Sequence, residues 1–151
     1  MKIFFLSIVF IFLTVISIKD IKKREVSNAW LLSLFFILLL LLLVVEERYP
    51  QNVLFVGVIL LFGVILSNLR ILGGADSKLI AILTLVISPY YVKLFIFFLA
   101  CLILVTCSIY GVGLWLGKAQ RSHGIPLVPA ISLAGWMCLW LTLMDTHGLV
   151  S

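Results

Sequence analysis

The chain has 151 residues, of which 64% are hydrophobic and only 11% are charged, and its mean hydropathy is +1.33. A water-soluble domain of this length could not cover so much apolar surface, so the composition predicts an all-α integral membrane protein. The net charge of +5 is spread over short loops between apolar segments, which argues against a nucleic-acid-binding groove and favours anionic lipid headgroups as the counter-charge.

Six apolar segments follow one another along the chain, and each approaches the roughly 20 residues with which a helix crosses the hydrocarbon. We predict six transmembrane helices in a single polytopic membrane domain that covers residues 1–151. In chain order they are Ile3–Ile18, Ala29–Val45, Val53–Leu69, Leu79–Val92, Leu94–Leu116 and Ile125–Met144. The first ends in bulky residues without a small-residue cleavage pattern, so we expect it to be retained rather than removed as a signal.

The distribution of Lys and Arg predicts the topology. With six crossings and both termini outside, the cytoplasmic loops carry eight of these residues and the outer side carries three. The fourth segment is short between Lys78 and Pro89, and if it turned back on itself the balance would fall to seven against four. The positive-inside rule therefore favours six crossings. Asp20 and Asp76 are then both expected at the cytoplasmic side.

These two aspartates are the strongest functional signal in a chain with only six acidic residues. A carboxylate is costly to hold near hydrocarbon, so two of them at the same predicted depth suggest a functional pair. Two structural explanations stay open. Asp20 lies four residues before Arg24, which would suit a surface ion pair on one helix. Asp76 follows Gly73 and Gly74 and precedes an apolar run, which would suit a helix N-cap.

Cysteine and histidine point away from metal or redox chemistry. Cys101, Cys107 and Cys138 lie inside apolar segments without a Cys-x-x-Cys motif, which is typical of small packing residues. His123 and His147 are predicted on opposite sides of the membrane and so could not share a metal ion. We expect no metal and no cofactor.

Three short stretches resemble the motifs of type IV prepilin peptidases. Asp20 and the following Arg24-Glu25-Val26-Ser27-Asn28 are similar to the family's Asp-(x)n-Arg-x-Ile-Pro-Asn stretch after an early helix. The second stretch, Gly73-Gly74-Ala75-Asp76-Ser77-Lys78-Leu79, resembles the family's Gly-x-Gly-Asp-x-Lys-Leu segment. The third, Ile125-Pro126-Leu127-Val128-Pro129-Ala130, resembles the Pro-Phe-Gly-Pro-Ala opening of its last helix. The chain departs from these patterns by carrying Ser27 for a proline, and Ala75 and Val128 for glycines.

The resemblance implies an aspartic endopeptidase of the bacterial inner membrane, which removes the short basic leader of prepilins or pseudopilins at the cytoplasmic face. Asp20 and Asp76 would be its catalytic pair. Gly73, Gly74 and Ala75 would form a turn that presents backbone groups to the substrate. Arg24 and Asn28 would orient Asp20 or cap the second helix. Lys78 would anchor the chain at the membrane interface or contact the substrate, and Pro126 and Pro129 would start the last helix.

The chain has no counterpart of the cytoplasmic insertion with paired Cys-x-x-Cys motifs that larger family members carry. It therefore resembles the short, peptidase-only branch that serves Flp or Tad-type pili, and this resemblance implies neither methyltransferase activity nor S-adenosylmethionine binding. The alternative is a non-enzymatic transporter or channel subunit, or a scaffold for a secretion machine. That class would need charged residues nearer the middle of the helices.

Overall fold

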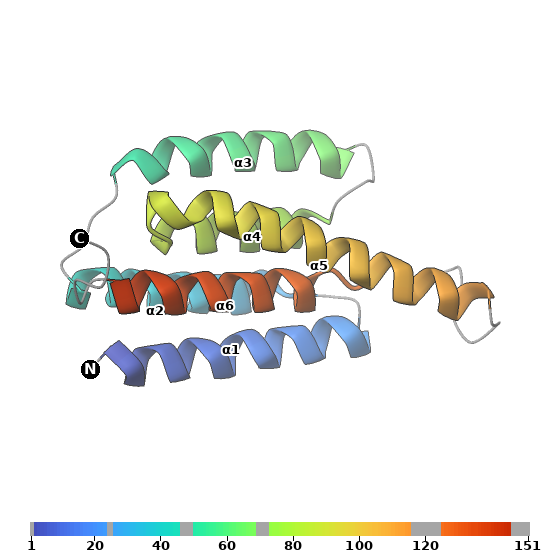
Figure 1. Cartoon of the computed structure of the whole chain (residues 1–151), viewed down its shortest axis with the longest axis horizontal. Coiled ribbons are helices and arrows are strands. Elements are labelled where there is room, and N and C mark those ends of the chain that lie inside the picture. The colour runs from blue at the N-terminus through green and yellow to red at the C-terminus, as the bar shows by residue number, and fades with distance from the viewer. Residues whose placement is uncertain (1, 24–25, 46–49, 69–72, 116–124, 146–151) are drawn as a thin grey trace.

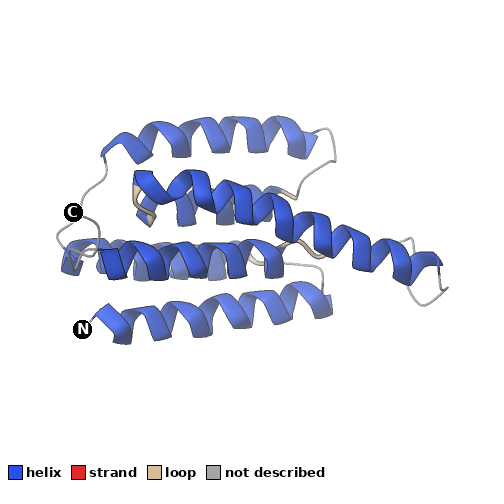
Figure 2. Ribbon diagram, viewed as in Figure 1, coloured by secondary structure: helices blue, strands red, loops and turns tan. Residues whose placement is uncertain are grey.

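The computed structural model describes residues 2–23, 26–45, 50–68, 73–115 and 125–145. These residues form six helices joined by short connections, with no strand among them (Figure 2). The helices are α1 (Lys2–Lys23), α2 (Asn28–Val45), α3 (Pro50–Asn68), α4 (Gly74–Val86), α5 (Pro89–Trp115) and α6 (Val128–Asp145).

The core of the fold is a ring of four helices. Helix α1 packs on α2 and α6, and α4 packs on the same two helices from the other side. Outside this ring, α3 packs on α4, and α5 packs on α6 and extends beyond the bundle (Figure 1). The elongated bundle therefore has two ends, and every functional motif can be assigned to one of them.

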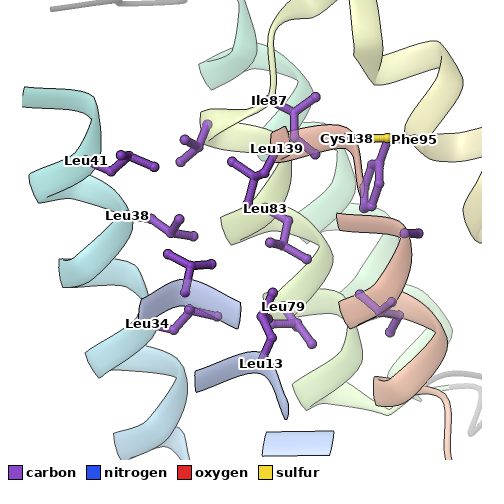
Figure 3. Packing of buried hydrophobic residues seen from close by; sticks show 14 of the residues in the cluster. Leu13, Leu34, Leu38, Leu41, Leu79, Leu83, Ile87, Phe95, Cys138 and Leu139 are labelled. Carbon is purple, nitrogen blue, oxygen red and sulfur yellow. The ribbon is translucent and has the colours of Figure 1, made fainter. Parts of the chain in front are cut away.

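Apolar residues at alternating spacings of three and four explain why the ring closes. This spacing places side chains on one face of a helix. In α2 the buried members are Leu31, Leu34, Leu38 and Leu41, none more than 3% exposed. They face the buried residues of α4 and α6, among them Leu83 and Leu139 (Figure 3).

The six predicted segments correspond to the six helices, but several predicted boundaries differ by a few residues, and the boundary between the fourth and fifth segments is misplaced. The sequence interpretation ended the fourth segment at Val92 and began the fifth at Leu94, on either side of Lys93. In the structure α4 ends at Val86 and α5 begins at Pro89, so Lys93 lies inside α5. Proline restricts the preceding residue to extended backbone and cannot donate within a helix, so the break falls before Pro89.

The break between α4 and α5 is held by α6. The backbone N–H of Ser88 donates a hydrogen bond of 3.1 Å to the hydroxyl of Thr142, and Thr142 is only 3% exposed. A non-helical residue inside a helical bundle leaves its backbone groups without helical partners, and this contact satisfies one of them. The turn is therefore compatible with a buried position.

Three of the described helices are long and apolar enough to cross a membrane: Ile3–Lys22, Pro89–Gly113 and Val128–Asp145. Helices α2 and α3 are also apolar, with shorter qualifying stretches at Asn28–Leu43 and Val53–Ile65. Large hydrophobic side chains on the outside of the bundle are exposed, for example Leu54 at 71% and Leu104 at 67%. This is the surface of a membrane protein; six crossings and outward-facing termini remain predictions.

Candidate active site

Asp20 continues the buried stripe of α1. The stripe consists of Leu6, Val9, Leu13 and Ile16, none more than 3% exposed, and the next step of four residues reaches Asp20. Asp20 is itself only 9% exposed. Helix α1 extends to Lys23, five residues past the predicted end at Ile18, so Asp20 is helical and turned into the bundle. This burial argues against the surface position that an ion pair with Arg24 would need, and Arg24 itself lies outside the described residues.

Asp76 lies on the corresponding stripe of α4. It is the third residue of the helix, and Leu79 and Leu83, three and seven residues later, are both fully buried. The proposal of Asp76 as the N-cap is wrong, because Gly73 occupies that position. Instead the backbone N–H of Gly73 donates to the Asp76 carboxylate. This is the contact that an acidic residue in the first turn makes with the N-cap backbone in a capping box.

Both aspartates lie at the same end of the bundle. Helix α1 ends there, and helices α2, α4 and α6 begin there (Figure 1). Nearer the middle of the bundle, Leu13 of α1 and Leu79 of α4 belong to one buried cluster (Figure 3). The two stripes that carry the aspartates thus converge in the core.

The charges of the two aspartates interact. Asp76 precedes the apolar part of α4, and its pKa is raised from 3.8 to about 6, chiefly by burial. The charge of Asp20 adds to this rise, whereas the N–H of Gly73 opposes it. One carboxylate raises the pKa of another only over a short range. The fold therefore brings the two acidic side chains together at one end of the helix ring.

The adjacent glycines have different surroundings. A Cβ on Gly73 would lie 2.7 Å from Oδ2 of Asp76, which is too close, whereas a Cβ on Gly74 would lie 3.5 Å from the Ser67 hydroxyl. Gly73 has φ −68° and ψ 139°, a conformation open to any residue, so the requirement for glycine there is steric. Gly73 leaves room for the Asp76 carboxylate.

Lys78 and Asn28 connect α4 to α2 beside the aspartates. The Nζ of Lys78 donates a 3.0 Å hydrogen bond to the side-chain carbonyl of Asn28, and both residues are exposed. They form the polar part of a groove of about 330 Å³ whose other walls are apolar side chains of α2, α3 and α4. The remaining lining residues are Leu31, Leu32, Phe35, Val56, Leu60, Ala81, Ile82 and Leu85.

A second contact holds the side chain of Lys19, the residue before Asp20. The Lys19 ammonium lies 3.8 Å from the centroid of the Trp30 ring, and Trp30 also packs on Phe12 at 5.8 Å between centroids. A cation over an indole face is attracted by the ring quadrupole. This contact joins the end of α1 to the start of α2 and limits the rotation of the helix that carries Asp20.

The sequence profile of the type IV leader peptidase family matches residues 7–112. The chain belongs to the type IV leader peptidase family. The matched range covers most of α1, all of α2 to α4, and most of α5, and it includes both aspartates and the glycine turn. Neither the curated proteins nor the solved structures searched give a match. The family resemblance inferred from the sequence is thus confirmed.

The start of α6 lies outside the matched range. Helix α6 begins at Val128, so Pro129 is in its first turn, where a missing N–H leaves no helical bond unmade. Pro126 precedes the helix, so the prediction that it also lies in the first turn is wrong. Ala75, half-buried against the core, occupies the second position of α4.

Two features of the structure were not predicted from the sequence. Gly63 of α3 is buried directly against Ser77 of α4, and a Cβ at position 63 would collide with the Ser77 side chain. A glycine inside an apolar helix is the signal that could have indicated this close approach. The second feature is a mostly apolar groove between α1 and α6, beside which the buried Ser132 hydroxyl and Trp136 indole nitrogen have no hydrogen-bond partner among the described residues.

Proposed function

We propose that this leader peptidase is an aspartic endopeptidase in which Asp20 and Asp76 form the catalytic pair. The observation that carries the proposal is the electrostatic coupling between two acidic side chains that 56 positions separate in the sequence. The raised pKa of Asp76 supports a pair that keeps one proton up to a pH of about 6. Two neighbouring carboxylates resist double ionisation, as aspartic proteases require.

The hydrolysis follows from this single shared proton. The charged carboxylate accepts a proton from water as the water oxygen attacks the scissile carbonyl carbon, while the protonated carboxylate donates to the carbonyl oxygen. The tetrahedral intermediate then collapses: one of its hydroxyls returns a proton to the carboxylate that had donated one, the C–N bond breaks, and the proton taken from water passes to the leaving amine. The coupled pair titrates as a unit, so the proton belongs to both residues.

The proposed substrate is the leader of a type IV prepilin or pseudopilin, cut at the cytoplasmic face of the bacterial inner membrane. Three features support this: family membership, the concentration of Lys and Arg at the predicted cytoplasmic side, and the position of the pair at a bundle end rather than mid-helix. The short length between the motifs supports the peptidase-only Flp or Tad-type branch, with no methyl transfer.

The test uses purified protein in lipid nanodiscs and a prepilin with its leader. Asp20→Asn and Asp76→Asn should each reduce cleavage to background, because an amide can neither share the proton nor act as the base. Asp145→Asn, which changes an acid at the end of α6, is the matched control and should cleave normally. Normal cleavage by either of the first two variants, at normal levels of inserted protein, would refute the catalytic pair.

A further inference from the structure

The groove beside Lys78 is built from two matching helix faces. In α4 its lining runs from Lys78 to Leu85, and in α2 it runs from Asn28 to Phe35. In both helices the lining residues follow the polar one at steps of three, four and seven positions, which is the spacing of one helix face. Both helices begin at the aspartate end of the bundle (Figure 1), so each face starts there with a polar group and continues with apolar side chains.

The groove faces away from the aspartate pair and opens to the outside of the bundle. Asp76 lies on the buried stripe of α4, whereas Lys78 is exposed on another face of the same helix. Helices α2 and α3 both pack on α4 but make at most marginal contact with each other, so α4 forms the floor between them. Leu32 of α2 and Leu60 of α3, on opposite walls, are 56% and 40% exposed. The groove is therefore accessible from the surrounding membrane.

The polar end of the groove offers a positive charge and hydrogen-bond donors. The Lys78 ammonium carries three donors, and the 3.0 Å bond to the Asn28 carbonyl uses one of them. Because that carbonyl accepts from Lys78, the rest of the Asn28 amide is a donor group as well. Among the described residues, no acidic side chain lines the groove. A phosphate, which is negatively charged and only accepts hydrogen bonds when fully ionised, is complementary to this end.

The depth of the groove corresponds to one leaflet of a bilayer. The seven-residue step from Lys78 to Leu85 rises about 10 Å. A typical hydrocarbon layer is about 30 Å thick, or roughly 15 Å for each leaflet. Helix α4 ends at Val86, one residue past Leu85, so the floor stops at this depth. A substrate helix that spans the membrane would need a wall over the full thickness, whereas an acyl chain of one leaflet needs only part of it.

We propose that this groove binds an anionic phospholipid from the leaflet on the aspartate side. Its phosphate lies at Lys78 and Asn28, and one acyl chain lies between α2 and α3 above α4, where the small side chain of Ala81 leaves room. The charge at one end and the apolar walls beyond it match the two parts of such a lipid. The site does not depend on the proposed peptidase activity, so binding alone tests it.

Native mass spectrometry of the protein in detergent measures the affinity for the first bound lipid. Phosphatidylglycerol should bind about fivefold more tightly than phosphatidylcholine, because a lysine beside the headgroup attracts its net negative charge. Lys78→Gln keeps an N–H donor but removes the charge, and should lower the affinity for phosphatidylglycerol about fivefold. Lys78→Arg should restore it. Lys93→Gln is the matched control, since Lys93 is exposed on α5 outside the groove. Equal losses in Lys78→Gln and Lys93→Gln would overturn the proposal.

Photo-crosslinking in nanodiscs tests where the lipid lies. A phosphatidylglycerol with a diazirine in its acyl chain should label residues 28–35 and 78–85 more strongly than Leu104 and Ile109, which are 67% and 68% exposed on α5. Labelling of α5 equal to that of the groove would overturn the proposal. Inorganic phosphate that bound as tightly as the lipid would also overturn it, because the acyl chain would then have no role. A prepilin that displaced the lipid label from the groove and crosslinked there itself would identify the substrate as the occupant instead.

Discussion

Replacing Gly73 and Gly74 one at a time distinguishes an effect on the position of the Asp76 carboxylate from a general effect on the start of α4. In Gly73→Ala the new Cβ would lie 2.7 Å from Oδ2 of Asp76. The carboxylate oxygen would have to move by roughly 0.7 Å to reach an ordinary contact of 3.4 Å. In Gly74→Ala the nearest atom, the Ser67 hydroxyl, is already at 3.5 Å, and nothing has to move.

This displacement predicts a large kinetic effect. A misplacement of about 1 Å at a reacting group costs about 100-fold in rate, so Gly73→Ala should lower kcat about 10- to 100-fold, or about 1.4–2.7 kcal/mol. Stability should change by less than about 1 kcal/mol, the cost of Ala at an N-cap. Gly74→Ala should be close to wild type in both respects. Cleavage of a prepilin in nanodiscs measures kcat, and thermal unfolding measures stability.

The pH dependence supplies a further readout that a purely structural defect would not move. The N–H of Gly73 lowers the pKa of Asp76 by favouring its charged form. Displacing the carboxylate weakens that bond, so the pKa should rise and the alkaline limb of the pH–rate profile should move to higher pH. The reasoning is refuted if Gly74→Ala loses as much activity as Gly73→Ala, or if the alkaline limb stays in place.

In the wild type the pH–rate profile should be bell-shaped, with activity lost above about pH 6 as the pair gives up its shared proton, because the pKa of Asp76 is raised from 3.8 to about 6; a limb near pH 4 would contradict this. EDTA should leave turnover intact, and inhibition reversed by zinc would instead make the aspartates metal ligands. Gly63→Leu should destabilise the α3–α4 contact by about 1–3 kcal/mol in detergent unfolding, whereas Gly57→Leu, with open space around it, should not; equal losses would contradict the close packing. A cysteine at position 22 should resist a membrane-impermeant thiol reagent added from outside while one at position 48 reacts, and external labelling at position 22 would place Asp20 on the wrong side.

The position of the aspartates could be predicted from local patterns, because α1 obeys a simple rule. Its apolar residues recur at steps of three and four, and the same steps lead to Asp20. Motif order and the positive-inside rule then put Asp76 at the same level. Burial of Asp20 and its coupling to Asp76 required the packed structure, since a surface ion pair with Arg24 fits the sequence equally well.

The boundary between α4 and α5 could not be located by hydropathy. Residues 79–92 form an apolar run with no charge before Lys93, so a hydropathy criterion extends the fourth segment to that lysine. What ends α4 is Pro89 together with a partner for Ser88 that lies 54 positions further along the chain, Thr142.

The shortness of α4 has a consequence for what fixes the depth of the aspartate pair. Its 13 residues rise only about 20 Å, roughly 10 Å less than the thickness of a typical hydrocarbon layer. Because Thr142 satisfies the Ser88 backbone, the turn can lie well below the far boundary while Asp76 stays at the near one. No described residue of α4 after Lys78 is exposed, so neighbouring helices rather than bulk lipid surround this short segment. The depth of the carboxylates is then set by the packing of α4 against α2, α3 and α6, so substitutions in those contacts, more than a change of bilayer thickness, should shift the pair relative to a membrane-anchored substrate.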